Sequence, residues 1–362
     1  MEVPEGRGPG RRAAVFYNPA MRRDRDIAVA FFRAYSLRVG PVGRAWEMHA
    51  ATGVRGLRVL NETSALSELT LTDTQPQALA VARANADRFA ARGVRALAHD
   101  ATRALAGERF DLVDIDPYGS PIPFVDAALG SLRAGGLLAV TATDLLVLAG
   151  VQSSACERRY GARPIRGRLG PEAGLRILLG YLNRRAEEGR QRIVPLLSYV
   201  GSHHLRAYLR LDPVDARGST PASVGFLDPA TFDGPRLPPG GPYGPLWTGP
   251  LFDPGLVGAL EVPGTASEPA ELARFLDGLR SELAADVPLY YEANELARYL
   301  GLTSPPAVEP LLEGLREAGW ASGRGHEREG AFKTRAPRAE VERRAREHSG
   351  KPHHSQKARV RA

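Results

Sequence analysis

Apolar and polar positions alternate along the N-terminal part of the chain in a pattern that predicts a regular succession of strands and helices. From Arg44 to about Thr143, short runs rich in β-branched residues precede longer segments with apolar side chains at helical spacing. This alternation is typical of a parallel sheet with crossover helices. The predicted strands are Arg44–His49, Leu69–Thr72, Arg95–Ala98, Phe110–Ile115 and Leu137–Thr141. The predicted helices are Gly56 to about Thr63, Gln75–Ala91, and Phe124–Leu132 closed by Gly135-Gly136.

Beyond Cys156 the pattern changes and predicts a second, smaller domain of α+β type. A helix at Gly174–Glu188 is followed by Arg192–Tyr199 and His204–Leu211, which alternate like an antiparallel pair. Three further helices are predicted at Pro269–Ala285, Tyr290–Leu300 and Ala307–Ala318, and the last two resemble a helix-turn-helix with a following wing. We therefore expect a flexible N-terminus at 1–12, an α/β domain at 13–190, an α+β domain at 191–334 and a disordered basic tail at 335–362.

Composition fits an ordinary globular protein with room for two domains, since the 362 residues are 43% hydrophobic and 25% charged. The longest apolar run, Gly135–Val151, contains Thr141, Thr143 and Asp144, so we expect no membrane span. No secretory signal is recognisable, and the prediction is a cytoplasmic protein. The sole cysteine, Cys156, excludes intramolecular disulfides and zinc sites built on several thiolates.

The formal net charge of +7 is concentrated at the C-terminus. Residues from Lys333 to Ala362 include ten Lys or Arg against three acids, which is also +7. Such a segment cannot form a core of its own. It is either an electrostatic arm for nucleic acid or a solubilising extension, and the sequence favours neither.

Three acids follow three successive predicted strands: Asp73, Asp100 and Asp116. Ligands of open α/β sheets bind at the edge where parallel strands end, and an acid after the second strand suits ribose hydroxyls. Asp100 can accept a hydrogen bond from an adenine amine. The first loop reads T-G-V-R-G and lacks the G-x-G-x-x-G that would wrap a pyrophosphate, which disfavours NAD. S-adenosylmethionine fits better, with Arg25 or Arg55 as a partner for its carboxylate.

The segment after Asp116 suits chemistry on an amine attached to a flat ring. Pro117 ends the strand, and further prolines make the loop rigid, so that Asp116 and Tyr118 are held at the sheet edge. The Asp116 carboxylate and the Pro117 carbonyl can both accept protons of an exocyclic amine as a methyl group arrives.

Taken together, several motifs resemble those of the tRNA (guanine26-N2)-dimethyltransferases. The resemblance covers most of Val15 to Thr334. It rests on F-Y-N-P-A-M-R-R-D-R-D at Phe16–Asp26, A-T-G-V-R-G at Ala51–Gly56, D-I-D-P-Y-G-S-P at Asp114–Pro121, T-A-T-D at Thr141–Asp144, G-L-R-I-L-L at Gly174–Leu179 and G-P-L-W-T-G-P-L at Gly244–Leu251. It implies a class I S-adenosylmethionine-dependent methyltransferase domain with a Rossmann-like fold, followed by a tRNA-binding domain.

The resemblance also implies roles for individual residues. Asp116 is the expected proton acceptor, and Tyr118 and Phe16 are the aromatic side chains of the base pocket. The expected cofactor-binding residues are Arg25, Arg55, Asp73, Asp100 and Ala101. The chain departs from the family where Tyr118 replaces phenylalanine and Asp24 replaces asparagine. It also lacks the cysteine clusters of some members, so we predict no metal, and a monomer is the favoured state.

Other functions remain open at this stage. A methyltransferase for another base amine, such as adenine N6 or cytosine N4, would use the same residues. A noncatalytic tRNA-binding protein would rely on the helix-turn-helix segment and the basic tail. A carbon-5 pyrimidine methyltransferase needs a thiol nucleophile, and Cys156 lies away from the predicted sheet edge.

Overall fold

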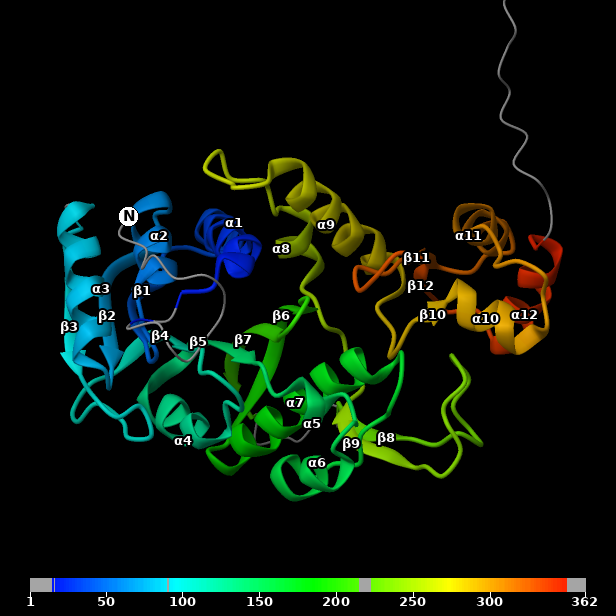
Figure 1. Cartoon of the computed structure of the whole chain (residues 1–362), viewed down its shortest axis with the longest axis horizontal. Helices are drawn as coiled ribbons and strands as arrows, with labels where there is room; N and C mark the ends of the chain where they lie inside the picture. The colour runs from blue at the N-terminus through cyan, green and yellow to red at the C-terminus, as the bar shows by residue number, and fades with distance from the viewer. Residues whose placement is uncertain (1–14, 16, 90, 215–222, 350–362) are drawn as a thin grey trace, which may run out of the picture. The chain divides into compact units, whose positions relative to one another are not determined.

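The computed structural model describes residues 15, 17–89, 91–214 and 223–349. Within these residues the chain forms two compact units. Unit 1 comprises the chain up to residue 232 together with 237–280, and unit 2 comprises 233–236 and the chain from 281 onward. Figure 1 shows the elements of both units, and each unit is described by itself.

Unit 1 is built on a seven-stranded sheet in the order β3-β2-β1-β4-β5-β7-β6. The strands from β1 to β5 pair in parallel, and β7 joins β5 and β6 in antiparallel pairs. The strands are β1 Gly43–Glu47, β2 Leu66–Asp73, β3 Val94–Ala98, β4 Phe110–Ile115, β5 Leu132–Ala142, β6 Gln191–Val200 and β7 Leu205–Pro213. The predicted parallel sheet is therefore confirmed, and the expected strands all form.

Helices cover both sides of this sheet, with α1 and α2 on one side and α4 and α7 on the other (Figure 1). Their apolar faces explain the arrangement: in α3, for example, Ala78, Leu79, Ala82 and Ala86 are buried at helical spacing. The helices are α1 Arg22–Arg38, α2 Val54–Glu62, α3 Pro76–Arg88, α4 Ile122–Ser131, α5 Leu145–Leu148, α6 Ser153–Tyr160, α7 Gly170–Glu188, α8 Pro254–Gly258 and α9 Pro269–Glu282. A short 3-10 helix, η1 Pro19–Met21, precedes α1, and β8 Val224–Leu227 pairs with β9 Tyr243–Trp247.

The glycine pair after α4 was expected to close that helix, and this prediction is wrong. Helix α4 ends at Ser131, and β5 already begins at Leu132. The pairing of β5 with β4 then shifts register between Phe110 and Leu112, where the Gly135-Gly136 pair lies in β5, and Gly135 has a φ of 75°. The glycines therefore permit an irregularity inside a strand instead of a helix end.

The predicted boundary at residue 190 also differs from the structure. The antiparallel pair was expected to open a second domain, but β7 pairs with β5 over Leu137–Ala142, so both strands of the pair extend the first sheet. The pattern of β6 and β7 revealed their antiparallel pairing with each other. It did not reveal that the second strand would add to an existing sheet edge, because alternation specifies a face and not a partner.

Unit 2 contains the predicted helix-turn-helix and wing. Its elements are η2 Leu283–Ala285, β10 Tyr291–Glu292, α10 Ala293–Leu300, α11 Val308–Glu317, β11 Ser322–Arg324, β12 Ala331–Thr334 and α12 Arg338–Glu347. The strands form a small antiparallel sheet in the order β10-β12-β11. Phe332 at its centre is fully buried and stacks on Tyr291 with ring centroids 5.4 Å apart.

The expected disordered tail is wrong for its first part, because residues 338–347 form helix α12. Val341 and Ala345, one helical turn apart, are buried in the same apolar cluster as Leu311 and Phe332. Two small apolar residues therefore suffice to dock a helix whose remaining positions are mostly charged. Residues 350–362 lie outside the described part of the chain.

Trp247 and His204 belong to the core of unit 1. Trp247 is 5% exposed, and its indole N–H donates to the carbonyl of Pro250 over 2.9 Å. His204 is also buried and hydrogen-bonded to Asp24, whereas His203 is exposed. Among the residues described, none of the helices is both long and apolar enough to cross a bilayer.

Candidate functional site

The loops that follow β1 to β5 meet at the carboxyl edge of the sheet, because these strands run parallel. Asp73 is the last residue of β2, Asp100 follows β3, and Asp116 comes directly after β4. The structure therefore places the three predicted acids along one edge. Phe16, the other predicted aromatic of the base pocket, lies outside the described residues.

Asp73 organises the loop between β1 and α2. Its Oδ2 accepts a hydrogen bond from the Ala51 N–H at 3.0 Å, and its Oδ1 accepts one from the Gln75 N–H at 2.9 Å. The loop needs this support because it contains two left-handed residues, Ala51 with a φ of 46° and Gly53 with a φ of 69°. Asp73 thus fixes the backbone that turns the chain into α2.

Asp100 and Ala101 lie on the next loop along the edge. Asp100 Oδ1 accepts hydrogen bonds from both the backbone N–H and the hydroxyl of Thr102, at 3.0 and 2.8 Å. Asp100 is exposed, whereas Ala101 is buried. The neighbouring Thr102 thus fixes the orientation of an acid that remains accessible from solvent.

Asp116 forms an ion pair with Arg55, whose Nη2 lies 2.7 Å from Asp116 Oδ2. The Arg55 side chain is only 7% exposed and that of Asp116 is 22% exposed. Burial alone would raise the pKa of Asp116, but the charges of Arg55 and Arg206 and a hydrogen bond from Thr141 lower it to about 2. Asp116 is therefore an ionised carboxylate at neutral pH. Arg55 Nη1 is buried and has no hydrogen-bond partner among the residues described.

Arg25 lies near this ion pair, at the start of α1. Its guanidinium group covers the ring of Tyr17 at 4.7 Å from the centroid, and its Nη2 donates to the Tyr17 hydroxyl over 3.0 Å. Burial lowers the pKa of Arg25; the charge of Tyr17 opposes this effect, and the positive charges of Arg55 and Arg58 lower the pKa further. Two guanidinium groups that repel each other favour the binding of an anion that both can contact.

The sequence analysis missed a buried ion pair next to Asp116, formed by Arg206 and Asp114. Arg206 of β7 makes a bidentate ion pair with Asp114 of β4, at 2.7 and 2.8 Å, and also donates to the Thr141 hydroxyl over 2.8 Å. The Arg206 side chain is fully buried. A signal was present, because both residues are charged and alternate with apolar residues in their strands, but the sequence does not show that β4 and β7 flank the same strand.

Glu47, at the end of β1, is a second buried group that the sequence analysis missed. Its Oε2 accepts the Gly56 N–H over 3.2 Å. Burial and the negative charge of Asp114 raise its pKa to about 8, against the opposing effect of Arg55. Glu47 is therefore largely protonated near neutral pH. A Cβ atom at position 56 would lie only 2.5 Å from Glu47 Oε2, which explains why this position is a glycine.

His49 lies two residues beyond the end of β1, within electrostatic range of the acids at the sheet edge. Its ring lies 4.3 Å from that of Phe124, edge to face. Burial lowers its pKa in spite of the nearby carboxylates of Asp116, Asp73 and Asp114. The imidazole is therefore neutral at physiological pH.

The loop after Asp116 is clamped to the end of β5. The Gly119 N–H donates to the Thr143 hydroxyl over 2.6 Å, and the Thr143 N–H donates to the Gly119 carbonyl over 2.9 Å. The Ser120 hydroxyl lies 2.9 Å from the Tyr160 hydroxyl, which donates to the Asp144 carboxylate. Tyr118 stands out from this clamped loop with 79% of its surface exposed.

Cys156 does not provide a nucleophile. It is fully buried in α6, and burial together with the charge of Asp144 raises the pKa of its thiol to about 12. Because the thiolate is the reactive form, a mechanism through this cysteine is excluded.

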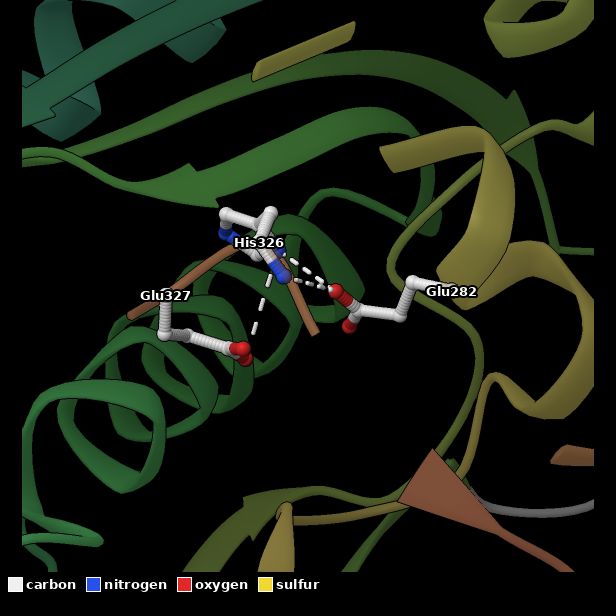
Figure 2. A group of neighbouring side chains, drawn as sticks. All are labelled: Glu282, His326 and Glu327. Carbon is white, nitrogen blue, oxygen red and sulfur yellow. Dashed lines mark hydrogen bonds and ion pairs between the residues drawn. The ribbon is translucent and has the colours of Figure 1, made fainter. Parts of the chain in front are cut away.

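Unit 2 contains a separate cluster that resembles a metal site, formed by Glu282, His326 and Glu327 (Figure 2). One potential ligand atom from each lies within 4.8 Å of the others. However, Lys333 Nζ is fully buried 2.6 Å from Glu282 Oε1 and 3.8 Å from Glu327 Oε1. His326 Nδ1 lies 2.6 Å from Glu282 Oε2 (Figure 2). The carboxylates already face the Lys333 ammonium and a histidine whose pKa they raise against the effect of burial. We therefore interpret the cluster as an ion network inside unit 2 that links the wing to Glu282.

The fold and the site edge of unit 1 define the protein class. The whole fold is similar to a solved structure of Trm1 from Pyrococcus horikoshii in complex with S-adenosyl-L-methionine. The two structures share 30% sequence identity and a TM-score of 0.82, over 95% of this chain and 99% of that one. Unit 1 is thus a class I S-adenosylmethionine-dependent methyltransferase domain with a Rossmann-like fold, as the sequence predicted.

Sequence comparison then specifies the family. The model of the N2,N2-dimethylguanosine tRNA methyltransferase family matches residues 8–224 and 240–346. A tRNA (guanine(26)-N(2))-dimethyltransferase from Thermococcus kodakarensis is 38% identical over 90% of this chain and 91% of its own length. One from Pyrobaculum arsenaticum is 35% identical over 94% of this chain and 93% of its own. The chain belongs to this family.

The raised pKa of Glu47 leads to a prediction about stability and pH. The folded protein retains this proton at pH values where the unfolded chain, with the ordinary value of 4.5, releases it. The contribution of Glu47 to wild-type stability should therefore fall as the pH rises from 4.5 to about 8. Glu47→Gln cannot ionise, so near pH 8 it should be more stable than the wild type by on the order of 3 kcal/mol. Urea unfolding between pH 5 and pH 8 measures this difference.

The control for this experiment is Glu68→Gln, because the side chain of Glu68 is 56% exposed on β2. It should follow the wild-type pH dependence closely. A Glu47→Gln protein with the same dependence as the wild type would contradict the assignment of a buried, protonated Glu47.

The cluster of unit 2 yields a second prediction. Glu282→Gln should lower the free energy of unfolding of unit 2 by about 3–5 kcal/mol, because it leaves Lys333 and His326 buried without their main counter-charge. Chemical denaturation measures the change, and Glu329→Gln in the same wing, at an exposed residue, is the control. Dialysis against EDTA should leave the melting temperature unchanged, whereas a marked loss on chelation would show a structural metal.

Proposed function

We propose that the protein transfers one or two methyl groups from S-adenosylmethionine to the exocyclic N2 of the guanosine at position 26 of tRNA. The observation that carries this proposal is the ionised Asp116 at the carboxyl edge, directly before Pro117 and the exposed Tyr118. Its relatives carry this activity in their names. An activity on tRNA also fits the predicted cytoplasmic location.

The cofactor is held by Arg25, Arg55, Asp73, Asp100 and Ala101 in this proposal. The buried Arg55 Nη1, which has no partner among the described residues, and the adjacent guanidinium of Arg25 suit the carboxylate of an amino acid. Asp73 and Asp100 offer carboxylate oxygens to a ribose and to an adenine amine, respectively. When bound, S-adenosylmethionine supplies an electrophilic methyl group on its sulfonium.

The residues of the chain then have to make a weak nucleophile reactive. The lone pair of guanine N2 is delocalised into the ring, so acceptors around its protons favour the tetrahedral amine that the transfer needs. The Asp116 carboxylate and the Pro117 carbonyl provide these acceptors. As the N2–CH3 bond forms and the bond between sulfur and methyl breaks, the positive charge moves from sulfur to the nitrogen, and one proton of the nitrogen passes to Asp116 and from there to water. A pKa of about 2 keeps Asp116 ready to accept that proton at neutral pH.

Base stacking positions the guanine in this proposal, between Tyr118 and Phe16. Tyr118 is 79% exposed on a loop that two hydrogen bonds to Thr143 hold in place. Stacking on an aromatic side chain is worth about 1–3 kcal/mol per base, which offsets part of the cost of leaving the RNA stack.

The proposed role of Asp116 predicts the effect of Asp116→Asn. The amide cannot accept the proton, so methyl transfer should fall roughly a hundredfold or more. Affinity for tRNA should change little, because Asp116 contacts the base and not the phosphates. Single-turnover assays and filter binding measure the two quantities, with the exposed Asp126→Asn as a control. Near-normal turnover of Asp116→Asn would remove Asp116 from the mechanism.

The whole proposal is tested by nucleoside mass spectrometry on unmodified tRNA incubated with the protein and S-adenosylmethionine. N2-methylated guanosine should form, and it should disappear when guanosine 26 is replaced in the transcript. The ratio of mono- to dimethylguanosine over time gives the number of methyl groups. Measurable tRNA binding without any methylated nucleoside would favour the noncatalytic alternative, and a methylated adenine or cytosine would indicate another base amine.

We also propose that unit 2 and the C-terminal residues hold the tRNA. The last thirteen residues, 350–362, contain four Lys or Arg and no acid. The truncation must spare Lys333, since its ammonium is buried in the ion network of unit 2. Removal of 350–362 should weaken tRNA binding and make its log–log salt dependence shallower by up to about 3 units, while catalysis at saturating tRNA persists.

The matched control is a full-length protein in which the four basic residues of 350–362 are replaced by glutamine. If the segment is an electrostatic arm, this protein should bind tRNA like the truncated one. Unchanged affinity and salt dependence in both would show that the segment only solubilises the protein.

A further inference from the structure

Three large apolar side chains are exposed around the loop that follows Asp116. Tyr118 is 79% exposed, Leu146 is 60% exposed and Val151 is 55% exposed. We call these three residues the apolar lip. Tyr118 already has a place in the proposed base pocket, but Leu146 and Val151 have no role in catalysis or cofactor binding as described above.

Topology and hydrogen bonds bring the apolar lip to one side of the site. Tyr118 follows β4 and Leu146 follows β5, which is its parallel neighbour, so both lie beyond the same edge. The two segments are tied together where Gly119, next to Tyr118, exchanges hydrogen bonds with Thr143. The Gln152 N–H in turn donates to the Leu146 carbonyl over 2.7 Å, which places Val151 beside Leu146.

Leu146 is exposed on a firmly packed element. Its neighbours in α5, Val147 and Leu148, are 3% and 0% exposed. Helix α5 packs so closely on α7 that a Cβ at Gly174 would lie 2.9 Å from the backbone of Leu148. Asp144, just before α5, is held by the Tyr160 hydroxyl at 3.0 and 3.1 Å. A leucine on such a firmly packed helix can contact a partner without moving from its position.

From this arrangement we propose that Leu146 inserts into the base stack of the tRNA and fills the space that the target guanosine leaves. The inference rests on the proposed function, because the occupant is the pair of bases that flank that guanosine. Proteins that distort nucleic acids often insert an apolar side chain between bases. An enzyme that acts on a stacked base must also compensate for its removal from the stack. Tyr118 then receives the extruded guanine while Leu146 keeps the gap closed, with Val151 beside it against the neighbouring nucleoside.

The test compares Leu146→Ala with Leu37→Ala, which removes the same side chain from a position that is 79% exposed at the end of α1, outside the site. Each protein is assayed in single turnover on two tRNA transcripts. One is unaltered, and the other has an abasic residue opposite guanosine 26, so that the guanosine leaves its stack more easily. Both leucines are exposed, so neither substitution should affect folding appreciably.

On the unaltered tRNA, Leu146→Ala should slow methyl transfer by roughly ten- to a hundredfold, the effect expected for one lost contact with a base. On the abasic transcript its rate should return to within about threefold of the wild type, because less extrusion is required. Leu37→Ala should match the wild type on both. No loss on the unaltered tRNA, or an equal loss on both transcripts, would overturn the proposal that Leu146 inserts into the base stack.

A second measurement tests the insertion of Leu146 independently of the proposed methyltransferase function. In a tRNA with 2-aminopurine at position 26, unstacking of the base increases fluorescence. The wild type and Leu37→Ala should produce this increase, whereas Leu146→Ala should not. If the wild type methylates neither transcript, the proposed function fails, yet the fluorescence still decides whether Leu146 opens the stack. An equal increase in fluorescence with Leu146→Ala and with the wild type would refute the insertion of Leu146.

Discussion

The site depends on the ion pair between Arg55 and Asp116. A carboxylate this close to the protein interior would tend to take up a proton, because burial disfavours its charged form. Arg55 prevents this, and Arg206, which is itself paired with Asp114, supplies a second positive charge. Two arginines thus balance two aspartates, and the third acid, Glu47, keeps its proton because burial and the negative charge of Asp114 outweigh the effect of Arg55. The ionisation state of each carboxyl follows from this local balance of charge.

This balance explains why the antiparallel hairpin belongs to the catalytic unit. Arg206 comes from β7, which follows the parallel part of the sheet in the chain and pairs with β5. Without β7, Asp114 would be left beside Glu47 and Asp116 with little compensation, and removing one partner of a buried pair is costly. The hairpin therefore completes the electrostatics of the edge as well as the hydrophobic core. Unit 2 follows the same rule, since Lys333 and His326 face Glu282 inside it.

Periodicity alone predicted most of the sheet of unit 1, because each parallel strand is a short apolar run followed by an amphipathic helix. The acids at the strand ends were also visible, since parallel strands end at a common edge. Long-range partners were not visible. The sequence shows that Arg206 lies in a strand, but its pairing with Asp114 depends on β7 joining β5. Gly135 was interpreted as a helix end because glycines with a positive φ occur both at the C-terminal ends of helices and in β-bulges. The helix at 338–347 was missed because only Val341 and Ala345 anchor it. The roles of the site residues themselves stay predictions.

The burial of Cys156 has a practical consequence for experiments on this molecule. As the sole thiol, fully enclosed and with a pKa near 12, it should be inert to maleimides while the protein is folded. A cysteine introduced at an exposed position would then carry a fluorophore or spin label at one defined place without removal of the native residue. The native chain is thus already suited to distance measurements between protein and RNA.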